Sequence, residues 1–309
     1  MRAPDVMVVG QLARDLVLLV DEVPDAGGSA PVRRRREMLG GKGANQAVAL
    51  AQLGAAVGLL AVIGDDEVGE RLLAQARADG IDVGTVRCRR GVRTGLIVDV
   101  VDGCGHWRYL EDLPDGVLVT PDDVAWAATS LRAARAVLVQ LQQPPAAALA
   151  AARTARDGGA MVVLDGAPSD PAATAELLVL ADVLRADARE TEQITGDRPE
   201  DADAGLAAGR ALVRRGPSLT AVEVAGVGNA FVWPDGELFV PLSETPTVDS
   251  TGAGDAFVAA LTRALLAGEP RDRAARLAVA AAGATVGHPG GRPALDPAAI
   301  RRQLDRIPG

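Results

Sequence analysis

The chain has 309 residues, of which 48% are apolar and 24% charged, and its formal net charge is −9. This length is enough for one large α/β domain or two modest ones. The longest apolar runs are shorter than the ~18 residues that span a bilayer, and the acidic balance argues against a broad nucleic-acid surface. We therefore expect a globular protein without nucleic-acid or membrane partners.

Cysteine content and the first residues both bear on localisation. Cys88 and Cys104 are the only cysteines, and they match neither a metal-binding pattern nor a disulfide framework. The residues 1–5 lead directly into the apolar run 6–9, which leaves no room for a signal peptide. Both features predict a cytoplasmic protein.

Apolar runs of strand length alternate with amphipathic segments of helix length along most of the chain. The predicted strands are 6–9, 16–20, 32–39, 57–63, 93–101, 106–110, 136–141, 161–164, 182–185, 220–224 and 230–233. The predicted helices are 47–54, 67–79, 145–157, 172–180, 202–215, 274–285 and one that begins near residue 255. This alternation favours an α/β fold with a mostly parallel sheet, and without a long linker or repeat we expect one domain, 1–309.

Two pairs of β-like segments interrupt the strand–helix rhythm. They are 16–20 with 32–39, and 93–101 with 106–110, the second pair joined by the turn 102–105. We expect about residues 12–39 and 91–112 to form one small sheet that covers a site. The residues 106–109 are His, Trp, Arg and Tyr in a chain with only 2% aromatic residues, so they either pack or contact a ligand.

Polar residues recur where the predicted strands end. Parallel α/β sheets place such residues on one edge, where ligands bind. The residues are Asp15, Gln142, Asp165, Asp187, Glu190 and Asp249.

Two further stretches stand out before the first predicted helix. The run Arg33–Arg36 is either a solvated strand or a clamp for an anionic substrate. The glycines of Gly40–Gly43 indicate a close approach of the backbone to another group. Because Lys42 is not followed by Ser or Thr, this stretch is not a P-loop.

The most informative stretch is 248–257, a glycine-containing turn that runs into an apolar helix. Gly252 and Gly254 allow successive N–H groups to converge at a helix N-terminus, which forms a cradle for an anion. Asp255 lies in the first turn of the same helix, so it places a base beside a phosphoryl group. An ordinary helix cap is the alternative.

Two motifs together resemble a known family. The stretch 40–47 (GGKGANQA) is similar to the first signature of the PfkB carbohydrate kinases, and 249–255 (DSTGAGD) is similar to the second, about 200 residues later. Within that family the chain most resembles the ribokinase branch, nearly from end to end. The resemblance implies a ribokinase-like three-layer α/β/α sandwich, with a central mostly parallel sheet and a small β-sheet lid.

The resemblance also implies an activity and a site. The activity is ATP-dependent phosphorylation of a primary hydroxyl of a sugar, with Asp255 as general base and the amides of Gly252, Ala253 and Gly254 as the anion hole. The implied sugar-binding residues are Asp15, Gly41, Lys42, Gly43, Ala44, Asn45 and Gln142. The implied nucleotide-binding residues are Asp187, Glu190, Glu223, Gly226, Gly228 and Gly254.

The resemblance also implies bound metal ions and a second copy of the chain. Glu190 would help to place Mg²⁺, through water. A monovalent cation, K⁺ as an activator, would be bound by loops that contain Asp249, Thr251, Thr285, His288, Gly290 and Ala294. The resemblance also implies a homodimer that is joined through the lids.

The chain departs from the family pattern at four positions. Ala13, Asp165 and Asp187 stand where the family usually has Asn, and Gln142 stands where ribokinase has Glu. These changes alter which hydroxyl groups the pocket can satisfy. Three alternatives to a sugar kinase therefore stay open: a nucleoside kinase, a sugar-phosphate kinase that uses the Arg33–Arg36 run, and a sugar-binding protein without activity.

Overall fold

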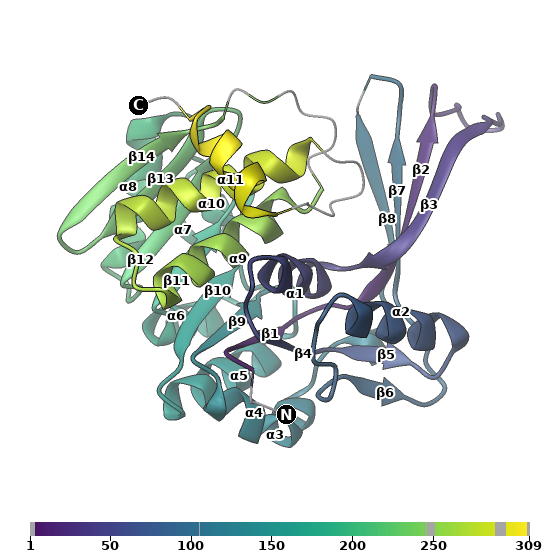
Figure 1. Ribbon diagram of the computed structural model, residues 1–309, viewed down its shortest axis with the longest axis horizontal. Helices are drawn as coiled ribbons and strands as arrows, with labels where there is room; N and C mark the ends of the chain where they lie inside the picture. Colours follow the sequence, from purple (N-terminus) through teal and green to yellow (C-terminus); the bar gives the residue numbers. More distant parts are fainter. Residues whose placement is uncertain (1–3, 105, 244, 246–250, 288–294, 308–309) are drawn as a thin grey trace.

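The computed structural model describes residues 4–104, 106–243, 245, 251–287 and 295–307. It contains a large sheet with helices on both faces, and a small sheet that projects from one side of it (Figure 1). The predicted fold class, a three-layer α/β/α sandwich with an additional small sheet, is confirmed.

The large sheet has eight strands in the order β14-β13-β12-β11-β10-β9-β1-β4. Their bounds are β1 Val6–Val9, β4 Val57–Leu60, β9 Ala136–Gln140, β10 Met161–Asp165, β11 Val183–Ala186, β12 Leu219–Val224, β13 Gly228–Trp233 and β14 Gly236–Pro241. Only the β12–β13 and β13–β14 pairs are antiparallel. The chain leaves β1 towards β4 on one side and returns to β9 on the other, which makes a crevice at the carboxyl ends of the strands.

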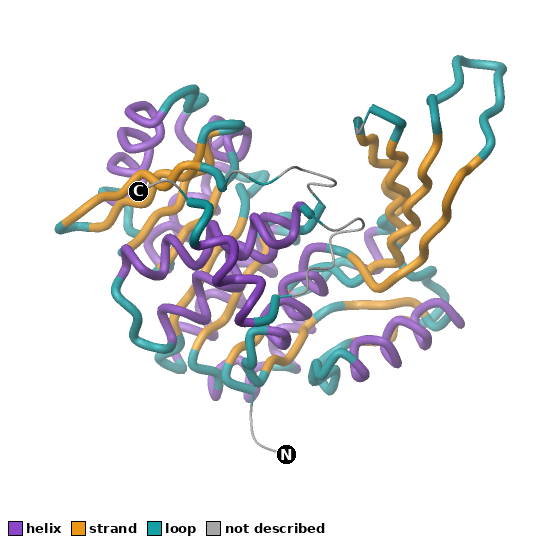
Figure 2. The backbone as a smooth tube through the Cα atoms, turned by 45° about the horizontal axis from the view of Figure 1, so that its top comes forward, coloured by secondary structure: helices purple, strands orange, loops and turns teal. Residues whose placement is uncertain are grey.

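Two layers of helices bury the two faces of this sheet (Figure 2). Side chains of β1 alternate between them, with Val6 and Val8 in one core and Met7 and Val9 in the other. The first layer contains α1 Lys42–Gln52, α2 Glu67–Ala78, α9 Ala253–Leu266, α10 Arg271–Val286 and α11 Pro297–Leu304. The second contains α3 Pro121–Trp126, α4 Ala128–Ala133, α5 Pro145–Asp157, α6 Pro171–Leu180, α7 Ala188–Thr195 and α8 Ala202–Val213.

The small sheet joins the two strand pairs that interrupt the α/β rhythm. Its order is β3-β2-β7-β8, with β2 Ala13–Val20, β3 Val32–Gly40, β7 Leu96–Val101 and β8 Trp107–Asp112. The outer pairs are antiparallel and the central β2–β7 pair is parallel. The predicted association of the two pairs into one sheet is therefore correct.

Several local predictions are wrong. The predicted strand 57–63 is two strands, β4 and β5 (Val62–Gly64), and β5 pairs with β6 (Arg87–Arg89) in a separate two-stranded sheet. Both pieces are buried and apolar, so residue type does not mark the change of sheet. Helix α1 begins at Lys42 rather than at residue 47, and Asp15 lies inside β2 rather than at the end of β1.

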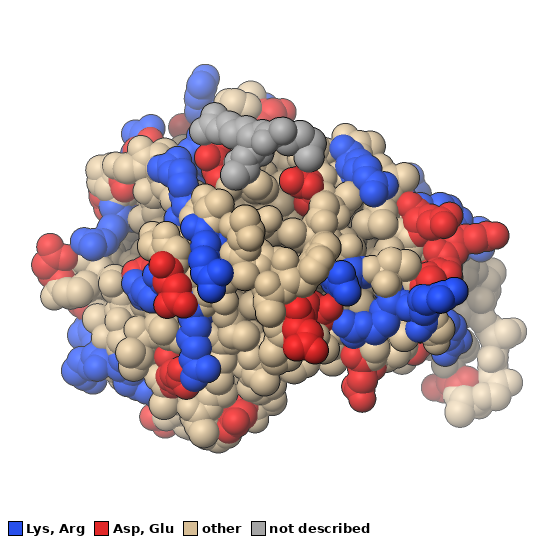
Figure 3. All heavy atoms as spheres, turned by 90° about the horizontal axis from the view of Figure 1, so that it is seen from below, with Lys and Arg blue, Asp and Glu red and all other residues tan. Residues whose placement is uncertain are grey.

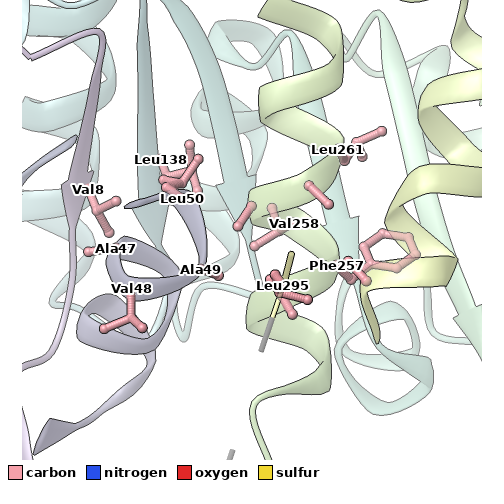
Figure 4. Close-up of a cluster of buried hydrophobic side chains, with 14 of the residues drawn as sticks. Val8, Ala47, Val48, Ala49, Leu50, Leu138, Phe257, Val258, Leu261 and Leu295 are labelled. Atoms are coloured by element: carbon pink, nitrogen blue, oxygen red, sulfur yellow. The ribbon is translucent and has the colours of Figure 1, made fainter. Parts of the chain in front are cut away.

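A shared core holds α1 against α9. Leu50 of α1 and Val258 and Leu261 of α9 are fully buried, and Leu138 of β9 lies beside Leu50 (Figure 4). Small residues such as Ala47 leave room for close packing between the helices. Each buried side chain of this size contributes about 1.5–3 kcal/mol. This packing fixes the N-termini of both helices relative to each other.

The surface shows no single-sign field on the face in Figure 3, where Lys and Arg are interspersed with Asp and Glu. Within the described residues, no helix has the length and apolar character needed to cross a membrane.

Candidate active site

The N-terminus of α9 offers free backbone donors. Gly252 precedes the helix with φ 73°, a left-handed conformation that glycine adopts without strain. The first helical hydrogen bond runs from the Ala256 N–H to the Gly252 carbonyl (2.9 Å). The N–H groups of Ala253, Gly254 and Asp255 thus have no partner within the helix, and together with the helix dipole they make a terminus suited to binding an anion.

The side chain of Asp255 is buried beside these donors. It is 6% exposed, and it accepts hydrogen bonds from α1 on both carboxylate oxygens. Asn45 Nδ2 is 3.2 Å from Oδ2, and Gln46 Nε2 is 3.2 Å from Oδ1. The two signature motifs therefore meet at this carboxylate.

The environment of Asp255 suits a general base. Burial raises the pKa of Asp255 to about 6, and the negative charge of Asp165 acts in the same direction. The charge of Lys42 and the hydrogen bonds from Asn45 and Gln46 oppose this rise. A carboxylate with this pKa is ionised at neutral pH and is a stronger base than an exposed one.

Gln46 also connects Asp255 to a buried ion pair. Its Nε2 atom donates to Asp165 Oδ2 at 2.8 Å, and Asp165 Oδ1 is 3.3 Å from Arg185 Nη1. Arg185 Nη2 in turn donates to Glu223 Oε2 at 3.0 Å. A series of hydrogen bonds and an ion pair thus connects Asp255 through Gln46, Asp165 and Arg185 to Glu223, which lines the cleft.

The N-terminus of α7 contributes a second acidic group. The Asp187 carboxylate accepts a hydrogen bond from the Glu190 N–H, and the Glu190 carboxylate accepts one from the Asp187 N–H, both at 2.8 Å. This reciprocal pair caps the N-terminus of the helix. Burial raises the pKa of Glu190, although Arg185 and Lys42 partly offset this rise. The Lys42 Nζ atom lies 3.8 Å from Glu190 Oε1. Burial lowers the pKa of Lys42, but Asp165, Glu190 and Asp255 outweigh this effect and leave it above its ordinary value.

These groups open into a cleft of about 450 Å³. Its polar wall includes Lys42, Arg185, Asp187, Glu223, Asn229 and residues 251–255. Its apolar wall comes from α9 and α10, with Phe257, Val279, Ala282, Gly283 and Val286. One end is therefore suited to phosphates and the other to an aromatic base.

Two aromatic residues of β8 close one side of the cleft. Trp107 and Tyr109 line it, with ring centroids 4.6 Å apart. The Tyr109 hydroxyl is 2.9 Å from Thr251 Oγ1, next to the start of α9. The small sheet therefore contacts the turn that precedes α9. Residues 106–109 were predicted either to pack or to contact a ligand, and Trp107 and Tyr109 line the cleft, where a ligand could touch them.

Gly40, Gly41 and Gly43 allow chain segments to approach each other closely. A Cβ at Gly40 would lie 1.8 Å from the carboxylate carbon of Asp15, and a Cβ at Gly43 would lie 2.7 Å from the carbonyl carbon of Gly10. Gly41 has φ 84°. The first contact places Asp15 against the end of β3, directly before α1, and the second places the start of α1 against the segment that follows β1.

The structure separates some predicted site residues from this cleft. Gln142 is exposed and lines another cavity, of about 750 Å³, with Pro144 and Pro168. Gly226 and Gly228 lie at the β12–β13 turn, and neither lines the cleft that contains Asp255. The buried hydroxyl of Thr285 donates to the Ala281 carbonyl (2.9 Å). The predicted residues Asp249, His288, Gly290 and Ala294 lie outside the described residues.

Two residues of the polar network around Asp255 were not predicted as site residues. Gln46 belongs to the first signature, and its place one residue after Asn45 was the available signal. Arg185 lies at the end of a strand, where its charge was the only signal. Asp165 was singled out as a polar residue at a strand end and as a departure from the family pattern, and its contact with Gln46 places it beside Asp255.

The carboxylates near the cleft do not form a metal cage. Among the described residues, no group of three or more His, Cys, Asp or Glu side chains could hold a metal ion. Glu190 is engaged by Arg185, Lys42 and the Asp187 N–H. This donor set fits Mg²⁺ held mainly by phosphates and water, as is usual for a nucleotide-bound ion.

The chain belongs to the pfkB family of carbohydrate kinases, whose family profile matches residues 3–298. It is an ATP-dependent carbohydrate kinase. The family that the two signatures indicate is therefore confirmed.

Individual relatives agree with this assignment. The chain is 32% identical to the ATP-dependent ribose-1-phosphate kinase of Halopiger xanaduensis, over 94% of each chain. It is 30% identical to a bifunctional ribokinase/ribose-5-phosphate isomerase A of Fructilactobacillus sanfranciscensis over 84% of this chain, which spans only 48% of that longer protein. A solved structure of Arabidopsis thaliana ribokinase with ribose and ATP superposes with a TM-score of 0.83 at 26% identity, covering 98% and 99% of the two chains.

Proposed function

We propose that this chain transfers the terminal phosphoryl group of ATP to a primary hydroxyl of a sugar, with Asp255 as the general base. The observation that carries the proposal is the position of Asp255, buried in the first turn of α9 beside free N–H groups and held by Asn45 and Gln46. Such a site supplies both a proton acceptor and a cradle for the phosphoryl oxygens.

In this mechanism the sugar lies between β2 and the start of α1. Asp15, Lys42 and Asn45 bind its hydroxyl groups, and Gly41, Gly43 and Ala44 shape the backbone around it. The hydroxyl oxygen attacks the terminal phosphorus while its proton passes to Asp255. The bond from that phosphorus to the bridging oxygen breaks, and ADP leaves.

The nucleotide lies along the cleft with its phosphates at Gly252, Ala253 and Gly254. Its base occupies the apolar end between α9 and α10, near Asn229. Glu190, whose helix is capped by Asp187, would position Mg²⁺ through water, and the ion would neutralise phosphate charge when bound. Glu223 borders the phosphates, and Gly226 and Gly228 border the base from the β12–β13 turn.

The proposal also includes a lid, a dimer, a cellular location and an activating ion. The small sheet acts as a lid over the sugar, the lids of two copies form a homodimer, and the enzyme works in the cytoplasm. A monovalent cation, K⁺, activates it next to the loop that contains Thr251 and Asp249. Support for the lid comes from the Tyr109–Thr251 contact, which already joins the small sheet to the anion-binding loop.

A phosphorylated pentose is the second candidate substrate. The relative from Halopiger xanaduensis is a ribose-1-phosphate kinase. In the small sheet, Arg36 is in register with Val17, Asp99 and Tyr109, and Arg34 with Leu19, Val101 and Trp107. Residues in register share a face, so Arg34 and Arg36 lie on the same face as the aromatic residues that line the cleft.

A coupled measurement of ADP release with a panel of sugars, pentose phosphates and nucleosides tests the proposal. Turnover of a sugar or a pentose phosphate supports it, and turnover of nucleosides alone identifies a nucleoside kinase. If no candidate is turned over while several raise the melting temperature, the chain is a binding protein and the proposed chemistry is wrong.

A further inference from the structure

Arg185 lies directly against the helix terminus that would receive the phosphates. A Cβ placed on Gly254 would be 2.9 Å from Arg185 Nη2 and 3.1 Å from its Cζ. The guanidinium therefore occupies the space that any side chain at position 254 would need. It also lines the cleft together with Gly252 and Asp255.

The guanidinium has unused hydrogen-bonding capacity. It carries five N–H donors in a fixed plane. Among the described residues it makes two hydrogen bonds, from Nη1 to Asp165 Oδ1 (3.3 Å) and from Nη2 to Glu223 Oε2 (3.0 Å). Glu190 Oε2 is further away, at 3.7 Å from Nη1. Donors are therefore left for a ligand that enters the cleft.

The charges around Arg185 favour an anionic ligand. Burial lowers the pKa of Arg185, but Asp165, Glu190, Glu223 and Asp187 outweigh burial and keep the guanidinium charged. The positive end of the α9 dipole lies beside this cation, and the two repel each other until an anion lies between them. A polyphosphate, in turn, is repelled by the surrounding carboxylates unless a fixed cation faces it.

We propose that Arg185 is a catalytic residue that donates hydrogen bonds to the non-bridging oxygens of the transferred phosphoryl group. This inference rests on the proposed function. Asp165 and Glu223 hold the guanidinium in place, and the N–H groups of Gly254 and its neighbours bind the same phosphoryl group. Arg185 keeps its protons throughout: the proton of the sugar hydroxyl goes to Asp255, and the electrons of the broken phosphorus–oxygen bond leave with ADP.

Nucleotide titrations separate this role from a structural one. ATP and ADP differ by the terminal phosphate, so Arg185→Ala should weaken ATP binding about 10-fold or more and leave ADP affinity within about twofold. Arg185→Lys should keep part of the ATP preference, because it retains the charge but not the planar fork. Equal loss for both nucleotides, or no loss for either, would overturn the inference.

Turnover gives a second measure. With the sugar that the wild type phosphorylates, kcat of Arg185→Ala should fall about 10²–10³-fold, the usual loss for one donor to a transition-state oxygen. Added guanidinium ion should restore part of that turnover. Unchanged kcat would contradict the proposal.

Arg89 provides a matched control. Its guanidinium pairs with the buried carboxylate of Asp123 at 2.7 Å, and neither residue lines the cleft. Arg89→Ala should lower the melting temperature and leave ATP preference and kcat unchanged. If the wild type phosphorylates no sugar, the proposed function fails, whereas the ATP and ADP titrations still decide the role of Arg185.

Discussion

The Nδ2 atom of Asn45 lies 3.2 Å from the Oδ2 atom of Asp255, although the two residues are 210 positions apart in the chain. Each belongs to the first turn of a helix, Asn45 to α1 and Asp255 to α9. Because the two helices share a core, this contact fixes the proposed base relative to the loop that is proposed to bind the sugar.

Asp255→Asn should abolish phosphoryl transfer and preserve ligand binding. Asparagine has nearly the same shape but cannot accept the proton, and loss of a general base costs about 10²–10⁴-fold in rate. Steady-state kinetics and calorimetric titration of ATP and sugar would check both parts. Turnover near the wild-type rate would remove Asp255 as the base.

On the acid side, the pH dependence of kcat/KM should follow the ionisation of Asp255. Its carboxylate must be ionised to take a proton, and burial raises its pKa to about 6. The kcat/KM value in the free enzyme should therefore be level above about pH 6 and fall towards tenfold per unit below it. A profile that stays level down to pH 4 would contradict this assignment.

Asp165→Asn should move this acid limb to lower pH. The substitution keeps an oxygen that can accept from Gln46 but removes the negative charge that raises the pKa of Asp255. Lys42 and Arg185 remain as the charged groups near the base. Asp182→Asn, which alters an aspartate paired with Arg156 outside the cleft, is the control and should leave the limb in place.

Folding stability should depend on the same proton. The folded-state pKa of Asp255 lies above the ordinary value of 3.8, so its contribution to stability is complete below that value and is lost as the pH rises through about 6. The expected loss is on the order of 1–3 kcal/mol. Urea denaturation of wild type and Asp255→Asn at pH 5 and pH 8 should show a larger loss for the wild type; equal losses would contradict the prediction.

The four arginines of β3 should differ in their effect on substrate binding, according to the face of the small sheet on which each lies. Arg33 and Arg35 pair with Asp21 and Glu37, whereas Arg34 and Arg36 share the face of Tyr109. If the substrate carries a phosphate, changing Arg34 and Arg36 to Gln should raise its KM at least about 10-fold with little change for ATP. The matched pair of changes at Arg33 and Arg35 should have little effect. An equal effect of both pairs would exclude a face-specific phosphate contact.

Much of the fold was predictable because its elements are local. Strand β1 and helix α5 agree with the predicted ranges residue for residue, since an unbroken apolar run marks the first and proline and glycine bound the second. Helix α7 was not predicted. It is short and polar, and its start depends on the reciprocal caps of Asp187 and Glu190.

The site was predictable where its chemistry belongs to a motif. Asp255, the glycines before it and Asn45 fall within two recognisable stretches. Arg185 and Gln46 could not be assigned roles from sequence, because their partners Asp165, Glu223 and Asp255 lie on other strands and helices. For Gln142, position after β9 did not reveal that the side chain turns into a different cavity.

The packing of α1 on α9 has a consequence for biosynthesis. The loop that is proposed to bind the sugar is translated before the proposed base and phosphate cradle, since Asn45 precedes Asp255 by 210 positions. A nascent chain that carries only the first of these groups lacks the carboxylate that is proposed to activate the hydroxyl. The proposed phosphoryl transfer therefore requires a chain that extends at least past Asp255.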